Sequence, residues 1–552
     1  MTGQESYDVV VVGGGGSGAP LAARLSEDAG RSVLLLEAGP APTSATGFPA
    51  ELLAAGTIRG ADPAHPQNWA FASHLTPTRP YSIARGRILG GSTTTNGGYF
   101  VRARRADLDD WAASGNEQWG WAECLPFWRA LESDEQFGAD ALHGDAGPMP
   151  VTRVLPGHPV TAAFSAASAE AGFRAEPDKN GDEPEGHGPL PMNVRDGVRW
   201  NTGLAYLLPA LGRQNLEVRG GSTVRRVLFS GTRAVGVEFA DRAGAVHAVR
   251  AREVVLAAGA VLSPQLLLVS GVGPRAELER LGIEVVADSP GVGAGFSDHP
   301  QVQLAWRPRP GAPLGAAEGR AMESALNATV ALDGPGASGG ERLPPSADGR
   351  SDGADHAGRP HPHALGRGGE LLAEIEVLPM LKPMGTLLSG RDEPGAPLVF
   401  LVAVQNPGSR GRIRLASADP AARPVIDYDY LASPADRARM RAAVRLAARV
   451  AEAPAFAEVS AGLELDAAVR ADDDALDAWV AATLGTALHL SGSARMGPDD
   501  DPGAVVDQWG RVRGVSGLRV ADTSILPAVP RRGPAATAVL VGERIAAFLR
   551  GE

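Results

Sequence analysis

The apolar positions near the start of the chain predict two buried strands with a helix between them. Residues 7–12 include four consecutive valines, a pattern typical of a strand that is buried on both faces of a parallel sheet. A helix is predicted over residues 19–28 and a second apolar strand over residues 32–36. The chain therefore begins with the strand, helix and strand of a parallel α/β sheet.

Gly13, Gly15 and Gly18 connect the first strand to the helix in a G-x-G-x-x-G arrangement. In this motif the first glycine makes a tight turn, the second lets the backbone approach a pyrophosphate, and the third lets helix and strand pack closely. The second strand ends at Glu37, about 20 residues after the glycines, where a carboxylate accepts hydrogen bonds from ribose and disfavours the 2′-phosphate of NADP. A lone glycine motif is weak evidence, but all these features in register predict dinucleotide binding.

Later segments alternate between short strands and helices, which predicts a mixed α/β fold. Four segments are expected to be strands, the first three of them in a β-meander: 215–218, 224–229, 234–239 and 251–256. Strand-like runs between residues 371 and 428 predict an antiparallel sheet, and helices are expected over residues 434–452, 472–484 and 536–549.

Two stretches stand apart by composition. Residues 85–98 are rich in glycine and small hydroxyl residues, so their backbone can approach a flat ligand closely, although a structural loop explains them equally well. Residues 307–369 are rich in Gly, Ala, Pro, Asp and Arg, which predicts a flexible insertion with a short helix over residues 321–330. Three histidines in this insertion (His356, His361 and His363) lack a rigid scaffold, and no metal site is predicted.

The overall composition excludes several classes of protein. With 52 basic against 64 acidic residues the net charge is −12, which argues against nucleic-acid binding. Cys124 is the one cysteine, so no intrachain disulfide is expected. No apolar run approaches the roughly 18 residues of a membrane span, and we expect no leader before the first strand. A cytoplasmic protein is expected, with a peripheral contact at the inner face of the membrane left open.

Five motifs along the chain resemble, in order, those of the glucose–methanol–choline (GMC) family of flavin oxidoreductases. The first two are RGRILGGSTTTNG at residues 85–97 and GAVLSPQLLLVSGVGP at residues 259–274. The others are Pro290-Gly-Val-Gly with Asp298-His-Pro, His489-x-x-Gly-Ser, and Val520-Ala-Asp522. The resemblance covers nearly the whole chain outside residues 307–369. It implies that the dinucleotide is FAD.

The resemblance also implies a fold and a set of domains. The fold is an α/β fold in which a Rossmann-like FAD-binding domain, with a parallel sheet and a β-meander, is interleaved with an α+β substrate domain built on an antiparallel sheet. The FAD-binding domain is expected to comprise residues 1–75, 210–305 and 485–552. The substrate domain is expected to comprise residues 76–209 and 370–484, with residues 85–98 facing the flavin.

Cofactor-binding residues follow from the same resemblance. The ADP half of FAD would be held by Gly13, Gly15, Gly18 and Glu37, with Val224 and Ala258 close to the adenine or ribose. Around the isoalloxazine ring we expect Ser92, Asn96, Gly97, Asp522 and Ala535. Thr95 stands where some members carry a histidine that is covalently bonded to the flavin, so a non-covalent, dissociable FAD is expected.

His489 resembles the active-site histidine of the family. As hydride leaves an alcohol carbon for flavin N5, the hydroxyl proton must go to a base, and imidazole suits this role. Gly533 departs from the family, which usually has a second histidine or an asparagine there. Either His489 acts with a water, or a nearby side chain substitutes: Arg531, Arg532 or Asn96. His299, beside an aspartate and before a proline, is expected to be a structural hydrogen-bonding residue.

Subfamily motifs at residues 79–87, 92–104 and 143–150 and around Gly533 resemble the branch of the family associated with the mycofactocin system. That branch implies a dehydrogenase that oxidises mycofactocinol and passes electrons toward the respiratory chain, through a quinone or a cytochrome. Two alternatives stay open. One is a choline- or alcohol-type dehydrogenase or oxidase of a small metabolite, and the other is a non-redox flavoprotein with a lyase or binding role.

Overall fold

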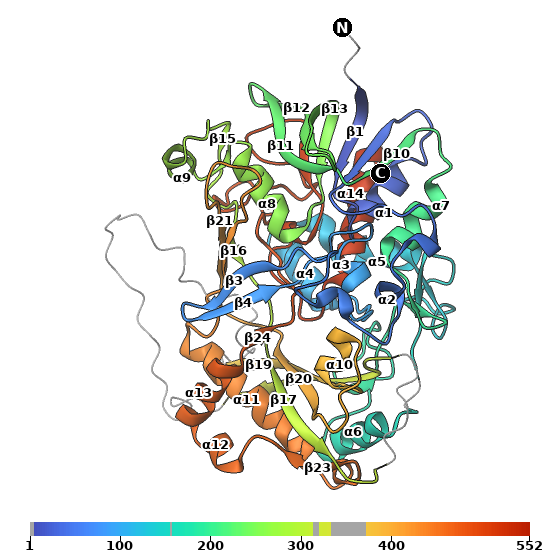
Figure 1. The fold of residues 1–552 in the computed structure, drawn as a ribbon, viewed down its shortest axis with the longest axis vertical. Coiled ribbons are helices and arrows are strands. Elements are labelled where there is room, and N and C mark those ends of the chain that lie inside the picture. Colours follow the sequence, from blue (N-terminus) through green and yellow to red (C-terminus); the bar gives the residue numbers. More distant parts are fainter. Residues whose placement is uncertain (1–4, 155–156, 313–319, 333–370) are drawn as a thin grey trace.

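The computed structural model describes residues 5–154, 157–312, 320–332 and 371–552. Within these residues the fold is a mixed α/β fold with both parallel and antiparallel sheets, as predicted. A largely parallel sheet lies at one end of the molecule and an antiparallel sheet at the other, with the residue 85–98 loop between them (Figure 1). Strand β1 (Ser6–Val12) and the C-terminus both lie at the end that carries the parallel sheet.

The first sheet is built on the buried strands that the valine and leucine runs predict. Its order is β10 (Leu216–Gly220), β2 (Val33–Glu37), β1 (Ser6–Val12), β13 (Val246–Leu256), β12 (Arg233–Ala240) and β11 (Thr223–Ser230), with β25 (Leu518–Val520) also paired to β13. The β10, β2, β1, β13 and β25 pairs are parallel, while β11 and β12 add the antiparallel meander. The carboxyl ends of the parallel strands therefore meet at one edge, where such sheets bind their ligands.

Two helices that are far apart in the sequence cover this sheet together. Helix α1 (Gly18–Leu25) follows the glycine turn, and helix α14 (Ala535–Arg550) packs against it. Their contact is close because a Cβ atom on Gly542 would lie 2.3 Å from the carbonyl oxygen of Ser17. Arg24 on α1 donates to Glu543 on α14 at 2.8 Å, which ties the two helices together at their buried interface.

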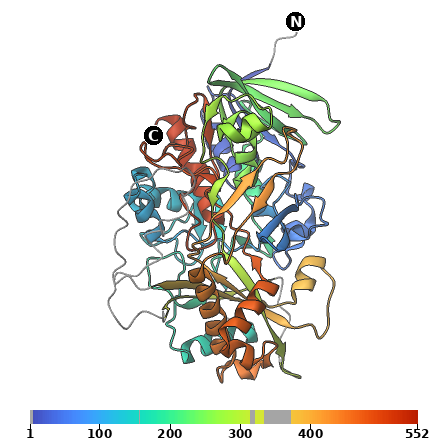
Figure 2. The same cartoon turned by 90° about the vertical axis from the view of Figure 1, so that its left-hand side faces the viewer.

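The second sheet is antiparallel. One of its faces packs into the hydrophobic core, and the other faces a cavity. Its order is β23 (Ser460–Leu463), β17 (Pro300–Pro308), β20 (Leu398–Val404), β19 (Leu372–Pro379), β18 (Ser324–Ala331) and β7 (His187–Pro189), with β24 (Gly485–Thr486) also paired to β17. Val302, Val377 and Val402 pack under helix α11 (Pro434–Ala451), which lies across this face (Figures 1 and 2). Alternate residues of the same strands therefore point the other way, toward the parallel sheet.

The prediction of a helix over residues 321–330 is wrong, because most of this segment forms strand β18 (Ser324–Ala331). A short run of apolar and small residues fits both a helical and a strand period, and pairing with β19 and β7 decides between them. Residues 307–308 are likewise the end of β17, so the start of the predicted flexible insertion belongs to the antiparallel sheet. His356, His361 and His363 lie outside the described residues.

Part of the predicted antiparallel run belongs to a different sheet. Strands β21 (Gly411–Arg414) and β22 (Val425–Asp427) belong to a five-stranded sheet. Its order is β16 (Ala294–Phe296), β21, β22, β3 (Phe71–Thr76) and β4 (Arg79–Ile83). This smaller sheet flanks the middle of the molecule (Figure 1). Strand periodicity along the chain identifies such strands, but it does not say which strands they join.

The remaining elements are short. The helices are α2 (Ala50–Leu53), α3 (Ser92–Thr95), α4 (Arg105–Ala113), α5 (Trp121–Leu131), α6 (Pro159–Glu170), α7 (Leu208–Ala210), α8 (Gly259–Val269), α9 (Arg275–Arg280), α10 (Met384–Ser389), α12 (Ala467–Ala471) and α13 (Asp473–Thr483). The strands are β5 (Glu132–Asp134), β6 (Met149–Val151), β8 (Val194–Arg195), β9 (Val198–Arg199), β14 (Val272–Gly273) and β15 (Ala287–Asp288).

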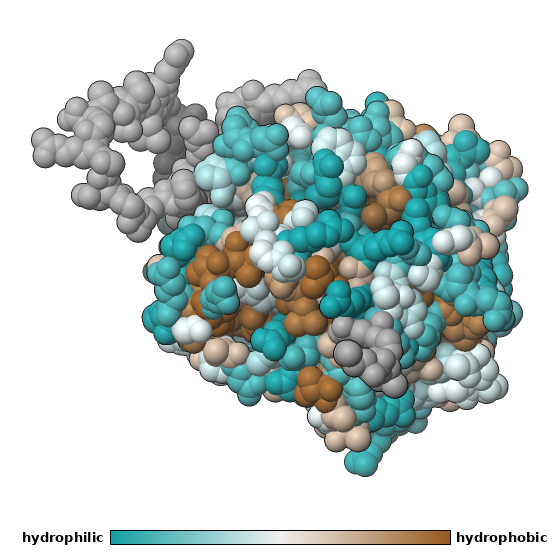
Figure 3. Space-filling model, turned by 90° about the horizontal axis from the view of Figure 1, so that it is seen from above, coloured by the Kyte–Doolittle hydropathy of each residue, from teal (hydrophilic) through white to brown (hydrophobic). Residues whose placement is uncertain are grey.

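Large hydrophobic side chains are rarely exposed among the described residues. None of the described helices combines the length and the apolarity that crossing a bilayer requires. Seen from the end that carries the parallel sheet, the surface is mainly hydrophilic with several apolar patches (Figure 3). Among the described residues, Val246 is the large hydrophobic side chain that lies exposed.

Candidate active site

A cavity of about 980 Å³ lies between the carboxyl edge of the parallel sheet and the free face of the antiparallel sheet. Nearly all the residues that the sequence singles out line it together. They are Gly13, Gly15, Glu37, Ser92, Asn96, Gly97, Val224, Ala258, His489, Asp522 and Ala535. The cavity is therefore continuous from the glycine turn to the histidine. Gly18 is the predicted residue that does not line it.

The three glycines of the turn are constrained in different ways. A Cβ atom on Gly18 would lie 1.9 Å from the carbonyl oxygen of Gly13, so the helix could not pack on the strand. Gly13 has a φ of +100°, and a Cβ there would lie 2.6 Å from the carbonyl oxygen of Ala257. A Cβ on Gly15 would meet only Gly91 Cα, at 3.8 Å. The protein itself therefore does not require glycine at position 15, but a ligand in the cavity close to that backbone would.

Glu37 is held rigidly at the end of β2. Its Oε2 accepts the backbone N–H of Gly14 at 2.9 Å, and its Oε1 accepts that of Gly39 at 2.8 Å. Burial raises the pKa of this carboxyl group, which is 6% exposed, while the two N–H donors oppose the rise. Each oxygen keeps acceptor capacity for a ligand hydroxyl group. The donor set thus fits the ribose of a dinucleotide.

Asp522 connects the end of β25 to the start of helix α8. Its Oδ2 accepts from the Ser263 hydroxyl at 2.5 Å and from the Gly259 N–H at 2.9 Å, and its Oδ1 accepts from the Ser524 N–H at 2.9 Å. Burial raises its pKa. Ala535 lines the cavity where α14 begins, and the first N–H groups of a helix favour negative charge near them.

His489 lies against a second histidine, His299, and their Nδ1 atoms are 2.9 Å apart. Nε2 of His299 is 2.9 Å from the carbonyl oxygen of Pro530, which can only accept, so this nitrogen carries the hydrogen. Burial lowers the pKa of His299 to about 3, so its ring is neutral and its Nδ1 is an acceptor. His489 therefore donates from Nδ1, and its Nε2 carries no proton.

One carboxylate positions both histidines. Oδ1 of Asp298 accepts the backbone N–H of His299 at 2.7 Å and that of His489 at 2.7 Å. Leu488, just before His489, has a φ of +67°, a strained conformation for a branched side chain that the surrounding contacts must hold. Burial, and then the neighbouring His299 and Arg85, hold the pKa of His489 well below its usual value. His489 is therefore a neutral imidazole in the cavity wall.

Gly533 lies beside the unprotonated nitrogen of His489. A Cβ atom on Gly533 would lie 3.3 Å from both Cε1 and Nε2 of that ring. Arg531 pairs with Asp107, Asp110 and Glu374, and Arg532 pairs with Glu176, so neither arginine lines the cavity. Asn96 does line it. Of the three substitutes that the sequence suggests, Asn96 is the one that shares the cavity with His489.

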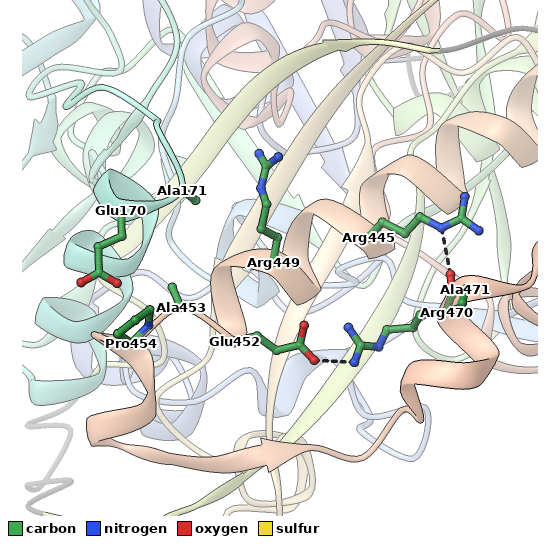
Figure 4. Close-up of a pocket in the computed structure, with 9 residues that line it drawn as sticks. All are labelled: Glu170, Ala171, Arg445, Arg449, Glu452, Ala453, Pro454, Arg470 and Ala471. Atoms are coloured by element: carbon green, nitrogen blue, oxygen red, sulfur yellow. Dashed lines mark hydrogen bonds and ion pairs between the residues drawn. The ribbon is translucent and has the colours of Figure 1, made fainter.

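A second hollow of about 650 Å³ lies on the surface, at the ends of α6, α11 and α12 (Figure 4). Its arginines already have partners. Arg445 donates to the carbonyl oxygen of Arg470 at 2.9 Å and to Asp473 at 2.6 Å, and Arg470 pairs with Glu452. None of the predicted site residues lines this hollow. The chemistry is therefore in the larger cavity.

A buried cluster of charged side chains has the residue types of a metal site. Its members are Glu132, Asp134, Asp178, His143, Arg102 and Arg153. Arg102 pairs with Glu132 at 2.5 Å, and Arg153 pairs with Asp134 at 2.6 Å. Although burial opposes it, hydrogen bonds to Asp134, Asp178 and Glu132 raise the pKa of His143 to about 10. Each carboxylate of the cluster pairs with an arginine or with His143, so the structure shows an ion-pair network of three cations and three carboxylates.

Comparison with known proteins shows the family. The sequence profile of the GMC oxidoreductases matches residues 7–301 and again residues 407–542. The chain belongs to the GMC oxidoreductase family. A GMC-type oxidoreductase of Rhodococcus erythropolis is 39% identical over 559 residues, with both chains covered completely. Human mitochondrial choline dehydrogenase is 33% identical over 559 residues, covering 100% of this chain and 90% of the relative.

The fold of this GMC oxidoreductase agrees with solved structures. Pyridoxine 4-oxidase from Mesorbium loti superimposes with a TM-score of 0.85 at 28% identity, covering 99% of both chains. Formate oxidase of Aspergillus oryzae has the same TM-score at 23% identity and shows likeness of fold alone. GMC oxidoreductases bind FAD, and the chain is an oxidoreductase that acts on the CH–OH group of its donors.

We expect the Gly15→Ala and Gly18→Ala variants of this oxidoreductase to fail in different ways. The new Cβ at position 15 clashes with no protein atom, so folding is unchanged while FAD affinity falls by at least about tenfold. The Cβ at position 18 meets Gly13, so the protein is destabilised by about 1–3 kcal/mol. Urea unfolding and fluorescence titration with FAD measure the two effects. Unchanged FAD affinity in Gly15→Ala would contradict the assignment.

Replacing His299 tests whether it sets the tautomer of His489. In His299→Phe the Nδ1–H of His489 loses its acceptor, so we expect flavin reduction to slow by roughly 10–100-fold with the donor KM unchanged. His299→Gln offers a carbonyl oxygen in its place and is expected to recover part of the rate. Anaerobic stopped-flow absorbance measures the rates, with thermal unfolding as the control for folding. A His299→Phe enzyme as fast as the wild type would show that His299 is only structural.

Proposed function

We propose that the protein is an FAD-dependent dehydrogenase in which His489 takes the hydroxyl proton of an alcohol donor. The observation that carries this proposal is the pair of histidines, because their hydrogen bonds leave Nε2 of His489 unprotonated in the wall of the cavity. A base must be within hydrogen-bond reach of the proton that it removes. Nε2 lies 3.3 Å from the position that a Cβ atom on Gly533 would take, and Gly533 is also part of the cavity wall.

The other cavity residues fit the cofactor. When FAD is bound, flavin N5 is the acceptor of the hydride from the donor carbon. The backbone at Gly13 and Gly15 would admit the pyrophosphate, and Glu37 would accept hydrogen bonds from ribose hydroxyl groups. Val224 and Ala258 line the part of the cavity assigned to the adenine and ribose. The isoalloxazine is assigned to the part lined by Ser92, Asn96, Gly97, Asp522 and Ala535.

The electrostatics of the cavity suit removal of a proton from a neutral alcohol. His489 is neutral because its pKa is well below 6.5, so it is in the base form across the physiological range. A buried imidazolium is unfavourable by itself, but the negative charge that develops on the donor oxygen stabilises it. Asn96 would donate from its amide to the same oxygen, in the role that Gly533 cannot fill.

We expect the FAD to be dissociable. Thr95 lies in the cavity where some family members carry the histidine that bonds to the flavin, and a threonine hydroxyl group does not form that bond. Acid precipitation of the purified holoenzyme should leave the yellow colour in the supernatant. Flavin that stays with the precipitated protein would contradict this expectation.

The identity of the alcohol donor and of the electron acceptor completes the proposal. The subfamily motifs favour a mycofactocinol as donor, with a quinone or a cytochrome as acceptor, while the choline dehydrogenases among the relatives suggest a small alcohol. Anaerobic bleaching of the bound flavin with both classes of donor separates these candidates. Peroxide production in air would indicate an oxidase, and no bleaching by any donor would indicate a non-redox flavoprotein.

His489→Ala tests the base. We expect flavin reduction to slow by about 10²–10⁴-fold, the usual effect of losing a general base, with FAD still bound. In the wild type the rate should stay constant as the pH falls from about 8 to about 6, because the depressed pKa of His489 keeps the ring unprotonated. Stopped-flow reduction by one alcohol across this pH range measures both. An unchanged rate in His489→Ala would refute the assignment.

A further inference from the structure

The free face of the antiparallel sheet brings a row of polar residues to the cavity. Glu376 on β19 is paired in register with Ala403 on β20, and Ala403 with Gln301 on β17. Glu376 and Gln301 line the same cavity as His489, and so does Gln303, the next residue on that face of β17. The apolar neighbours in the sequence point to the opposite face, into the core under α11. The strand period therefore places a carboxylate in the donor part of the cavity.

Only one oxygen of this carboxylate is engaged by the protein. Glu376 is 3% exposed, and its Oε2 accepts from Asn327 Nδ2 at 3.2 Å and from the Tyr99 hydroxyl at 3.4 Å. Within the described part of the chain, Oε1 makes no hydrogen bond. Tyr99 also lines the cavity. Oε1 is open to the cavity, so a ligand that brings a hydrogen-bond donor can bond to it there.

The charges around Glu376 indicate which kind of ligand group would donate a hydrogen bond to its Oε1. Lys179 and Arg532 share the single carboxylate of Glu176, at 2.7 Å and 2.6 Å. Asn327 links Lys179 to Glu376, since its Oδ1 accepts from Lys179 Nζ at 3.0 Å. Burial raises the pKa of Glu376, while its hydrogen bond with Asn327 and the nearby Lys179 and Arg532 oppose the rise. As a carboxylate it balances the second cation of this buried group. A cationic ligand would add a positive charge that nothing in the group compensates, whereas a neutral hydroxyl group adds none.

We propose that Glu376, with Tyr99, is a recognition site for a second hydroxyl group on a neutral alcohol donor. The rest of the donor is largely apolar, because apolar side chains also line the cavity: Met322, Leu378, Met380, Met384 and Leu401. The inference rests on the proposed function and adds the donor class to it, a diol-type compound on an apolar frame. It distinguishes this chain's donor from the quaternary ammonium alcohol that names the choline dehydrogenases.

The test compares donors of equal length on the holoenzyme. A series of α,ω-alkanediols is measured by anaerobic flavin reduction beside the primary alkanols and the ω-amino alcohols of the same lengths. We expect the wild type to favour the best diol over its matched alkanol by about tenfold or more in kcat/KM, as a hydrogen bond to a charged group supplies. The amino alcohols should be no better than the alkanols. A preference for the amino alcohols, or no preference at any length, would overturn the proposal.

The variant Glu376→Met removes the acceptor from the site. We expect it to lower kcat/KM for the best diol by about 10–100-fold, through KM, while the matched alkanol changes by less than about threefold. Glu374→Gln is the matched control, because Glu374 is on the same face of β19, pairs with Arg531 at 3.1 Å and does not line the cavity. This control should leave the ratio of diol to alkanol unchanged.

The experiments distinguish a failure of the recognition site from a failure of the proposed function. Equal losses for diol and alkanol in Glu376→Met, with flavin still bound, would overturn the recognition site alone. Should the variant not fold, the wild-type ranking of the three donor series decides by itself. If no alcohol of any series reduces the flavin, the proposed function falls and the recognition site falls with it.

Discussion

The structure depends on backbone contacts that leave no room for side chains at the turn between β1 and α1. Gly18 lies against the carbonyl group of Gly13, and Gly13 lies against Ala257 at the end of β13. These contacts hold the helix close to the sheet and keep the carboxyl ends of the parallel strands at one edge. Glu37 ends β2, and Ala258 and Asp522 lie two residues after the ends of β13 and β25. The same contacts therefore bring the three residues to a single cavity.

The second constraint is the fixed tautomer of a neutral histidine pair. Asp298 holds the backbone of both His299 and His489, and the carbonyl group of Pro530 decides which nitrogen of His299 carries hydrogen. Each hydrogen bond then determines the next one, so the unprotonated nitrogen of His489 is beside Gly533 without the help of a charged partner. A neutral base of this kind is prepared by burial and hydrogen bonds rather than by an adjacent carboxylate at the ring.

Buried charges elsewhere are arranged in balanced groups. Three cations and three carboxylates surround His143, and Lys179 with Arg532 balances Glu176 with Glu376. Such networks are stable only when every charge is paired, since an unpaired buried charge is strongly destabilising. Because Arg531 and Arg532 are engaged in these buried ion pairs, they stabilise the packed interior and do not line the cavity beside Gly533. It also limits the charge that a donor can bring into the cavity.

The sequence by itself determined the glycine turn, the acid at the end of β2, the order of the family motifs and the position of His489. These features follow from local rules, because a turn, a strand end or a short motif is complete within a few residues. The strand β18, the partner sheet of β21 and β22, and the contact between His299 and His489 depended on residues far apart in the chain. Sequence periodicity does not specify such pairings.

Only the tertiary structure decided that Glu376 lies in the cavity wall and that Arg531 and Arg532 are buried in ion pairs. On the sequence Glu376 is one of two acids in an otherwise apolar strand, and Arg531-Arg532 fits a solvent-exposed turn. Pairing of β19 with β20 placed Glu376 on the cavity face, and the buried carboxylates of Glu374 and Glu176 drew the arginines inward. The physical reason is that burial and charge balance are properties of the packed molecule, since they depend on neighbours that the fold supplies.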